Sequence, residues 1–206
     1  MGEIVTSRSA RSTPLIDGRS ARAERTMDAV VVAFLELVEE GDLRPSAQRV
    51  AERAGVSLRS VFHHFADMEA LFATAADRQL RRIATLSTRV SPALPLPERI
   101  DSFVAVRARV LEAVSPVRRA SVLTEPFSHE VASRLRGARE TMRDEVAHVF
   151  APELSLRAAA DRRELLAALT AVTEWPAWES LRAHQELSLV QARRVMTRTI
   201  IALLKE

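Results

Sequence analysis

The chain has 206 residues, of which 47% are hydrophobic, enough to bury the core of one domain or of two small domains packed together. It has no apolar run near the roughly 20 residues that cross a bilayer and no secretory signal, so we expect a cytoplasmic protein without a membrane partner. The lack of cysteine excludes disulfides, zinc fingers and thiol chemistry, and a net charge of +3 does not by itself identify a nucleic-acid-binding protein.

The N-terminal part predicts an arm followed by a long helix. Residues 1–18 mix small polar residues and arginine without periodicity, which indicates a flexible basic arm. Over residues 19–40 the apolar side chains recur at helical spacing. Gly41 follows this run, as a glycine that ends a helix commonly does.

Three capping residues predict three further helices. Ser46 and Ser57 precede short helical stretches on either side of the turn sequence AGVS, and Asp67 precedes a longer one. The side-chain oxygens of these residues can accept hydrogen bonds from amides in the first turn of a helix.

Three closely spaced prolines, Pro92, Pro95 and Pro97, predict a boundary between an N-terminal module and a larger helical region. Pro176 falls inside a helical pattern and should kink or split it. The helices expected in this region cover 98–114, a short segment after Pro116, about 126–150, about 156–184, and 188–205. No strand pattern occurs, so the predicted fold is all-α with about nine helices.

The stretch VAERAGVSLRSV has the spacing of two short helices that cross tightly. Ala51, Gly55 and Val61 stand where such a crossing needs a small residue, a turning residue and a packing residue. An ordinary helical hairpin has the same packing needs. The local charge favours DNA binding instead, because four arginines stand against one glutamate, Glu52, between residues 44 and 65.

The adjacent histidines His63 and His64 could suggest a metal site or a catalytic pair. Neighbouring residues on a helix point about 100° apart, whereas a zinc pair is expected at positions i and i+4. The sequence also lacks an evident set of base, orienting partner and oxyanion donor. We therefore expect no metal, no cofactor and no catalytic residues, and we interpret the two histidines as neighbours of a phosphate.

The N-terminal third resembles the DNA-binding region of the tetracycline-repressor (TetR) family over TMDAVVVAFLELVEEGDLRPSAQRVAERAGVSLRSVFHHFADMEALF. The resemblance implies a homodimer whose third helix enters the major groove of double-stranded DNA, and a C-terminal domain that binds a small-molecule effector. The chain then divides into a basic arm (1–18), a three-helix helix-turn-helix domain (19–66) and a helical ligand-binding and dimerisation domain (67–206).

The resemblance also implies which residues meet DNA. Two positions depart from the family pattern, because Phe62 stands where a tyrosine hydroxyl usually meets a phosphate and Met68 where a lysine usually stands. Both changes remove a phosphate contact, while base recognition by Arg59 and Gln48 is less affected. The expected DNA-binding residues are Ser46, Gln48, Ser57, Leu58, Arg59, Ser60, Phe62, His63 and His64.

In the C-terminal region, bulky residues and two polar ones are candidates for the ligand pocket, although large side chains are first of all core residues. These candidates are Phe103, Arg107, Phe127, His129, Met142, Trp175 and Trp178. Apolar stripes on the last two helices are candidates for a dimer interface, although packing within one chain explains them equally. The interface candidates are Leu165, Leu169, Val172, Val195, Met196, Thr199, Ile200 and Leu203.

The sequence thus predicts a transcriptional regulator, not an enzyme, that represses from a palindromic operator and responds to a ligand. The alternative is a helical small-molecule-binding protein or enzyme that retains the helix-turn-helix only as a scaffold.

Overall fold

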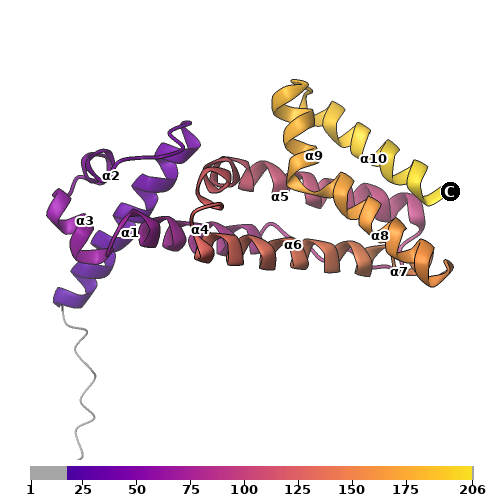
Figure 1. Ribbon diagram of the computed structural model, residues 1–206, viewed down its shortest axis with the longest axis horizontal. Coiled ribbons are helices and arrows are strands. Elements are labelled where there is room, and N and C mark those ends of the chain that lie inside the picture. The colour runs from indigo at the N-terminus through magenta and orange to yellow at the C-terminus, as the bar shows by residue number, and fades with distance from the viewer. Residues whose placement is uncertain (1–17, 206) are drawn as a thin grey trace, which may run out of the picture.

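The computed structural model describes residues 18–205, and every regular element in this range is helical. The elements are α1 (Gly18–Glu39), α2 (Ala47–Ala54), α3 (Leu58–His64), α4 (Met68–Ala84), α5 (Leu96–Thr124), α6 (His129–Val149), α7 (Ala151–Ser155), α8 (Ala159–Thr173), α9 (Trp175–Glu179), the π-helical turn η1 (Ser180–His184) and α10 (Leu189–Lys205). Figure 1 shows an elongated molecule with α1, α2 and α3 at one end and α7, α8 and α10 toward the other. Of the expected arm, residues 1–17 lie outside the described part, and Gly18 already belongs to α1.

The N-terminal core is built from the apolar faces of α1 to α4. Phe34 of α1 and Phe72 of α4 meet edge to face, with ring centroids 5.8 Å apart. Val61 of α3 and Leu71 of α4 are buried in the same core. The packing of this unit therefore extends into α4, beyond the boundary expected between residues 66 and 67.

The C-terminal core lies among α5, α6, α8, α9 and α10. Phe103 of α5 and Phe150, at the end of α6, form an edge-to-face pair with centroids 5.4 Å apart. Trp178 of α9 and Ile200 of α10 are fully buried against them. Helix α5 contributes Val117 and Ala120 to the N-terminal core as well, and α6 has Val131 in that core and Val146 in the C-terminal one, so these two helices join the two cores.

The break expected at Pro116 is wrong, because α5 runs unbroken to Thr124 with this proline inside it. A proline in a helix removes one amide hydrogen bond and crowds the preceding turn. Here Leu111 is buried in one core and Ala120 in the other, on either side of the proline. Tertiary packing on both sides therefore outweighs the local cost.

The split expected at Pro176 is confirmed. Helix α8 ends at Thr173, Glu174 is extended with φ −84° and ψ 166°, and α9 begins at Trp175 with Pro176 in its first turn. A proline is tolerated there because first-turn amides have no partner within the helix. Pro126 differs from the expectation, since α6 begins three residues later, where the Ser128 side chain accepts a hydrogen bond from the amide of Val131.

Candidate DNA-binding surface and ligand cavity

The turn between α2 and α3 is made by residues whose local chemistry suits it. Ser46 caps α2 by accepting from the amide of Arg49 at 3.3 Å, and Ser57 caps α3 by accepting from the amide of Ser60 at 3.1 Å. Gly55 ends α2 at φ 67°, in the left-handed region that a residue with a Cβ rarely adopts. The chain can therefore reverse within a few residues and place α3 across α2.

The outer face of α3 carries two pairs of exposed side chains at i, i+4 spacing. Leu58 and Phe62 form one pair, Arg59 and His63 the other, and the Phe62 side chain is 49% exposed. The opposite face is buried through Val61. In Figure 1, α3 lies at the far end of the molecule from α8 and α10, so this face is open to a large partner.

Three of the four arginines in the expected DNA-binding stretch make contacts within the chain. Arg49 pairs with Asp42, and Arg53 pairs with Glu40 at 2.6 Å. The hydrogen bond from Arg53 lowers the pKa of the Glu40 carboxyl, so this pair stays ionised. Arg44 donates to the main-chain carbonyl of Leu123 at 2.9 Å.

Arg59 is different, because it makes no hydrogen bond or ion pair with residues 18–205 and its side chain is exposed. Two of the four arginine charges counted from the sequence, those of Arg49 and Arg53, are thus paired with carboxylates. Arg59 is the guanidinium of this stretch that remains available to a phosphate or a base.

The other predicted DNA-binding residues lie beside Arg59 or at the start of α2. Gln48 is exposed and donates to Glu52 at 2.7 Å, and Ser60 shares a 2.8 Å hydrogen bond with the Ser57 hydroxyl. These contacts fix the side chains but leave them at the surface.

The two histidines lie beside each other at the end of α3. Their rings meet edge to face with centroids 5.2 Å apart, His63 is exposed and His64 is partly buried. Among residues 18–205 no group of three or more His, Asp or Glu side chains is placed to hold a metal ion. The same part of the chain has no helix that is both long and apolar enough to cross a membrane.

Two of the hydrogen bonds between the N-terminal helices and the C-terminal region lie next to the helix-turn-helix. The first is the bond from Arg44, in the segment before α2, to Leu123 near the end of α5. The second is donated by the hydroxyl of Ser128, before α6, to the carboxylate of Glu69 in the first turn of α4. The start of α4 directly follows α3, so both bonds hold the module that carries the exposed face.

A cavity of about 130 Å³ lies between α4, α5, α6 and the start of α9. Met142 and Trp175, two of the seven residues predicted from the sequence, line it. Gln79, which the sequence analysis missed, also lines it and is buried. The available signal was the position of Gln79 on the same face of α4 as Ala76 and Ile83.

The other five predicted pocket residues lie outside this cavity. Phe103 and Trp178 are fully buried in the C-terminal core, where neighbouring side chains fill the space around them. Phe127 lies in the turn before α6 and is 84% exposed, and His129 is exposed at the start of α6. The fifth residue, Arg107, is used to hold helices together.

Arg107 is buried on α5 and satisfied entirely by its own chain. Its guanidinium donates to the carboxylate of Glu145 at 2.9 Å and to the carbonyl of Met142 at 3.2 Å, and it stacks over the Phe103 ring at 4.9 Å. Burial lowers its pKa from the usual value of an arginine, and the charge of Glu145 opposes that change. Arg107 therefore joins α5 to α6, and its hydrogen bonds are made within the chain and not to a ligand.

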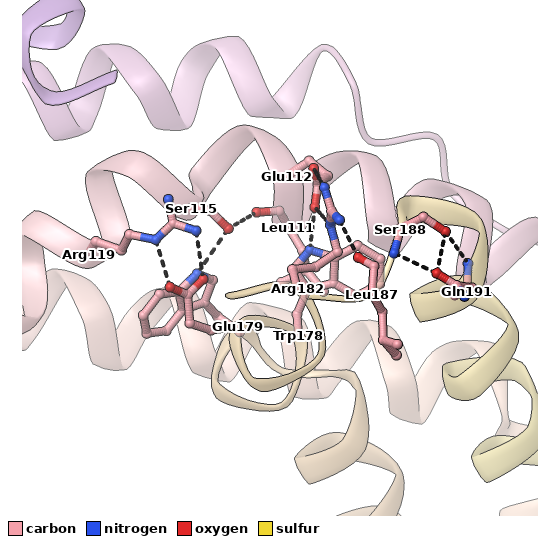
Figure 2. A network of polar contacts seen from close by, with 11 residues as sticks. Leu111, Glu112, Ser115, Arg119, Trp178, Glu179, Arg182, Leu187, Ser188 and Gln191 are labelled. Carbon is pink, nitrogen blue, oxygen red and sulfur yellow. Dashed lines mark hydrogen bonds and ion pairs between the residues drawn. The ribbon is translucent and has the colours of Figure 1, made fainter. Parts of the chain in front are cut away.

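A polar network holds α9 and η1 against α5, as Figure 2 shows. Glu112 accepts from Trp178 Nε1 at 2.8 Å and from Arg182 Nε at 2.8 Å, and hydrogen bonds from Arg182 and then Trp178 lower the pKa of its carboxyl. Further along α5, Arg119 pairs with Glu179 at 2.6 Å. These contacts fix α9, which provides part of the cavity wall, to α5.

The predicted dimer residues divide into two groups. Leu169, Met196 and Ile200 are buried in the core of their own chain and present no surface, so their assignment to an interface is corrected. The apolar stripe they belong to faces inward because α8 and α10 pack against each other and α10 packs on α5. The residues that keep exposed area are Leu165, Val172, Val195, Thr199 and Leu203.

The chain matches one family model over residues 32–75, described as bacterial regulatory proteins of the tetR family. No curated protein matches it in sequence. A transcriptional regulator from Rhodococcus sp. Rha1 is similar in structure, with a TM-score of 0.68 and 20% identity over 89% of this chain and 96% of that one.

Two further solved structures have the same fold. A putative TetR-family transcriptional regulator from Mesorhizobium loti has a TM-score of 0.61 and 20% identity over 91% of this chain and 97% of its own. The multidrug binding protein EbrR, complexed with imidazole, has a TM-score of 0.56 and 20% identity over 95% and 97%. Residues 32–75 are therefore similar to the DNA-binding region of tetR-family regulators, and the expected all-α fold with a helical C-terminal domain is confirmed.

Proposed function

We propose that this chain, with its tetR-family DNA-binding domain, is a ligand-responsive repressor that binds a palindromic operator as a homodimer. Helix α3 enters the major groove, and Arg59 contacts a base edge there. One observation carries the proposal: Arg59 is exposed without a partner in residues 18–205, while the neighbouring arginines Arg44, Arg49 and Arg53 all have one. A guanidinium left free on an open helix face suits bidentate contact with guanine.

Contacts to phosphates position α3 on the duplex. Ser46 and Gln48 are exposed at the start of α2, and His63 is exposed near the end of α3. Hydroxyl, amide and imidazole groups at these places can donate to phosphate oxygens on both sides of the groove. Phe62 has no hydroxyl, so it offers only apolar contact. The affinity for DNA then comes from Ser46, Gln48, His63 and Arg59.

A palindromic operator requires a DNA-binding protein with twofold symmetry. We assign the contact between two copies to α8 and α10, which lie side by side at the end of the molecule away from α3. Leu165, Val172, Val195 and Thr199 keep exposed area on these helices. Two helices from each copy then form a four-helix interface.

The ligand response is assigned to the cavity beside α4. This helix lines the cavity through its middle and follows α3 directly, so an occupant that displaces α4 also displaces the DNA-contacting module. The multidrug binding protein EbrR, which shares the fold, was solved with imidazole. This likeness supports the assignment of an effector site to the cavity of this chain.

A retardation assay with the DNA upstream of the gene tests the proposal, together with gel filtration at micromolar concentration. We expect a dimer and a shifted band that persists in excess random DNA. A monomer with no preference for any genomic fragment at low salt would overturn the proposal. It would favour a helical small-molecule-binding protein in which the helix-turn-helix serves only as a scaffold.

A further inference from the structure

The cavity between α4, α5, α6 and the start of α9 has walls made mainly of apolar side chains. Each of the four helices contributes, and the apolar lining includes Leu80, Ile83, Val114, Leu135, Met142 and Trp175. Val114, Leu135 and Met142 line this space and keep part of their surface exposed. Because removing apolar surface from water is favourable, an apolar occupant that covers these side chains is stabilised in the cavity.

Gln79 belongs to the lining, but its amide is not offered to an occupant. The residue is 4% exposed, and its Nε2 donates to the main-chain carbonyl of Ala113 at 2.6 Å. Its Oε1 is buried and has no partner among residues 18–205, so a molecule in the cavity does not reach it. Gln79 therefore supplies neither a donor nor an acceptor to a ligand.

Two other neutral polar groups of the lining are also engaged within the chain. The hydroxyl of the buried Ser121 donates to the carbonyl of Val117 at 2.7 Å. Nε1 of Trp175 donates to the hydroxyl of Ser115 at 3.1 Å. A polar group placed in the cavity thus gains no hydrogen bond from these donors to replace the bonds to water that it loses.

The arginines of the lining are held by carboxylates of their own chain. Arg118 and Arg139 both pair with Glu125, and Arg134 pairs with Asp77 at 3.0 Å. All three arginine side chains keep exposed area, so water also reaches them. An anionic occupant would have to compete with these carboxylates and with water for the guanidinium groups.

The carboxylate of the lining, Glu174, is partly exposed and lies near a buried cation. Burial lowers the pKa of Arg107, and the charges of Glu145 and then Glu174 oppose that change. The negative charge of Glu174 is thus already offset within the chain, so a cationic occupant gains little from it.

The volume of the cavity limits the size of an occupant. It is about 130 Å³. An apolar cavity of roughly 150 Å³ is large enough to hold benzene. One six-membered ring is therefore the size of molecule that the cavity accepts without moving its walls.

We propose that the cavity binds a neutral apolar molecule of about one six-membered ring, of the monocyclic hydrocarbon class, and selects against its polar and charged analogues. The proposal rests on the proposed function only in treating this cavity as the effector site, and it adds the chemical class of the effector. An apolar ring covers the exposed apolar lining, whereas a hydroxyl or a charge on that ring would lose water without gaining a partner.

The test compares toluene, phenol and benzoate, which share one ring and differ in polarity and charge. Each is titrated into the full-length protein without DNA, in sealed samples, and binding is followed by NMR. The indole N–H resonance of Trp175 reports on the cavity, and that of Trp178, buried in the C-terminal core, is the internal reference. We expect toluene to bind about 5- to 150-fold more tightly than phenol, because the phenol hydroxyl loses its hydrogen bonds to water. Benzoate should bind more weakly than phenol, because its charge is costlier to bury.

Two variants locate the binding site. Val114→Phe places a ring of the chain itself in the cavity, and it should weaken toluene binding at least about tenfold. Val122→Phe is the matched control, because it makes the same change on the same helix at a position that is 44% exposed and outside the lining. It should leave toluene binding unchanged. Thermal unfolding shows whether Val114→Phe is folded, and the comparison of the three ligands on the wild type needs no variant.

Phenol or benzoate binding as tightly as toluene would overturn the proposal. Equal affinities of folded Val114→Phe and Val122→Phe for toluene, or a wild type that toluene does not saturate, would do the same. Because the titrations contain no DNA, their failure is distinct from failure of the retardation assay, which would overturn the proposed function alone.

Discussion

The guanidinium of Arg44 donates to the carbonyl of Leu123 at 2.9 Å, across 79 residues of sequence. This bond joins the segment that leads into α2 to the last turn of α5. It is one of the side-chain hydrogen bonds that tie the N-terminal helices to the helices around the cavity.

Replacing Arg44 with alanine should loosen this connection. We expect the free energy of unfolding to fall by about 1 kcal/mol, the usual net value of one intramolecular hydrogen bond. Chemical denaturation measures it. Arg25→Ala removes another exposed arginine, one that makes no hydrogen bond within residues 18–205, and it should change stability by less than about 0.5 kcal/mol. Equal effects would contradict a role for the Leu123 contact.

Replacing Arg59 with alanine tests base recognition. If the guanidinium contacts a base, operator binding should weaken by about 1–3 kcal/mol, with little change in binding to random DNA. Retardation assays over a range of salt concentrations measure both. Arg81→Ala on α4 serves as the control, because it removes the same charge from an exposed position away from α3. An equal loss on both DNAs, with a flatter salt dependence, would identify a phosphate contact instead.

Two glycine substitutions should have opposite effects on stability. Gly55 lies at φ 67°, so Gly55→Ala forces a Cβ into the left-handed region and should destabilise the protein by about 1–2 kcal/mol. Gly137 lies within α6, and no atom of residues 18–205 outside its own helical turns comes within 4 Å of the place that a Cβ would take. Gly137→Ala should therefore stabilise the protein by about 0.5–1 kcal/mol. Thermal unfolding of the two variants measures both effects, and a shift of the same sign in both would refute the argument.

The contacts of Glu112 should make stability depend on pH. Hydrogen bonds from Arg182 and Trp178 lower the pKa of its carboxyl below the usual value of a glutamate in the folded protein. A lowered folded-state pKa contributes stability that is present above the unfolded-state pKa and is lost as the pH falls through the folded-state pKa. The wild type should therefore lose more stability than Glu112→Gln between about pH 5 and pH 3, in denaturation curves measured at each pH. Parallel losses would rule out this contribution.

The N-terminal region was predictable because its determinants are local. Capping residues such as Ser46 and Ser57, and the turning residue Gly55, specify helix ends through their own chemistry, and the structure shows each in that role. The exposed face of α3 follows from helical spacing once Val61 is known to be buried. What the sequence did not reveal is which arginines have partners, since Arg53 meets Glu40 only after α1 and α2 have packed.

The cavity was harder to predict because it depends on packing between distant helices. Phe103 and Met142 are both bulky apolar residues of the helical region. Phe103 fills the C-terminal core, whereas Met142 lines the cavity. Arg107 was assigned to ligand binding as a polar anchor near bulky side chains, whereas in the structure its guanidinium is paired with Glu145. No local pattern marks Gln79 as the residue with an unpaired oxygen.

Pro116 has a mechanical consequence for α5. Its missing amide leaves the carbonyl of Glu112 without the usual helical donor, at a point between the stretch of α5 in one core and the stretch in the other. A helix bends most easily where a main-chain hydrogen bond is missing. A bend of α5 at this proline would therefore break fewer helical hydrogen bonds than a bend elsewhere along the helix.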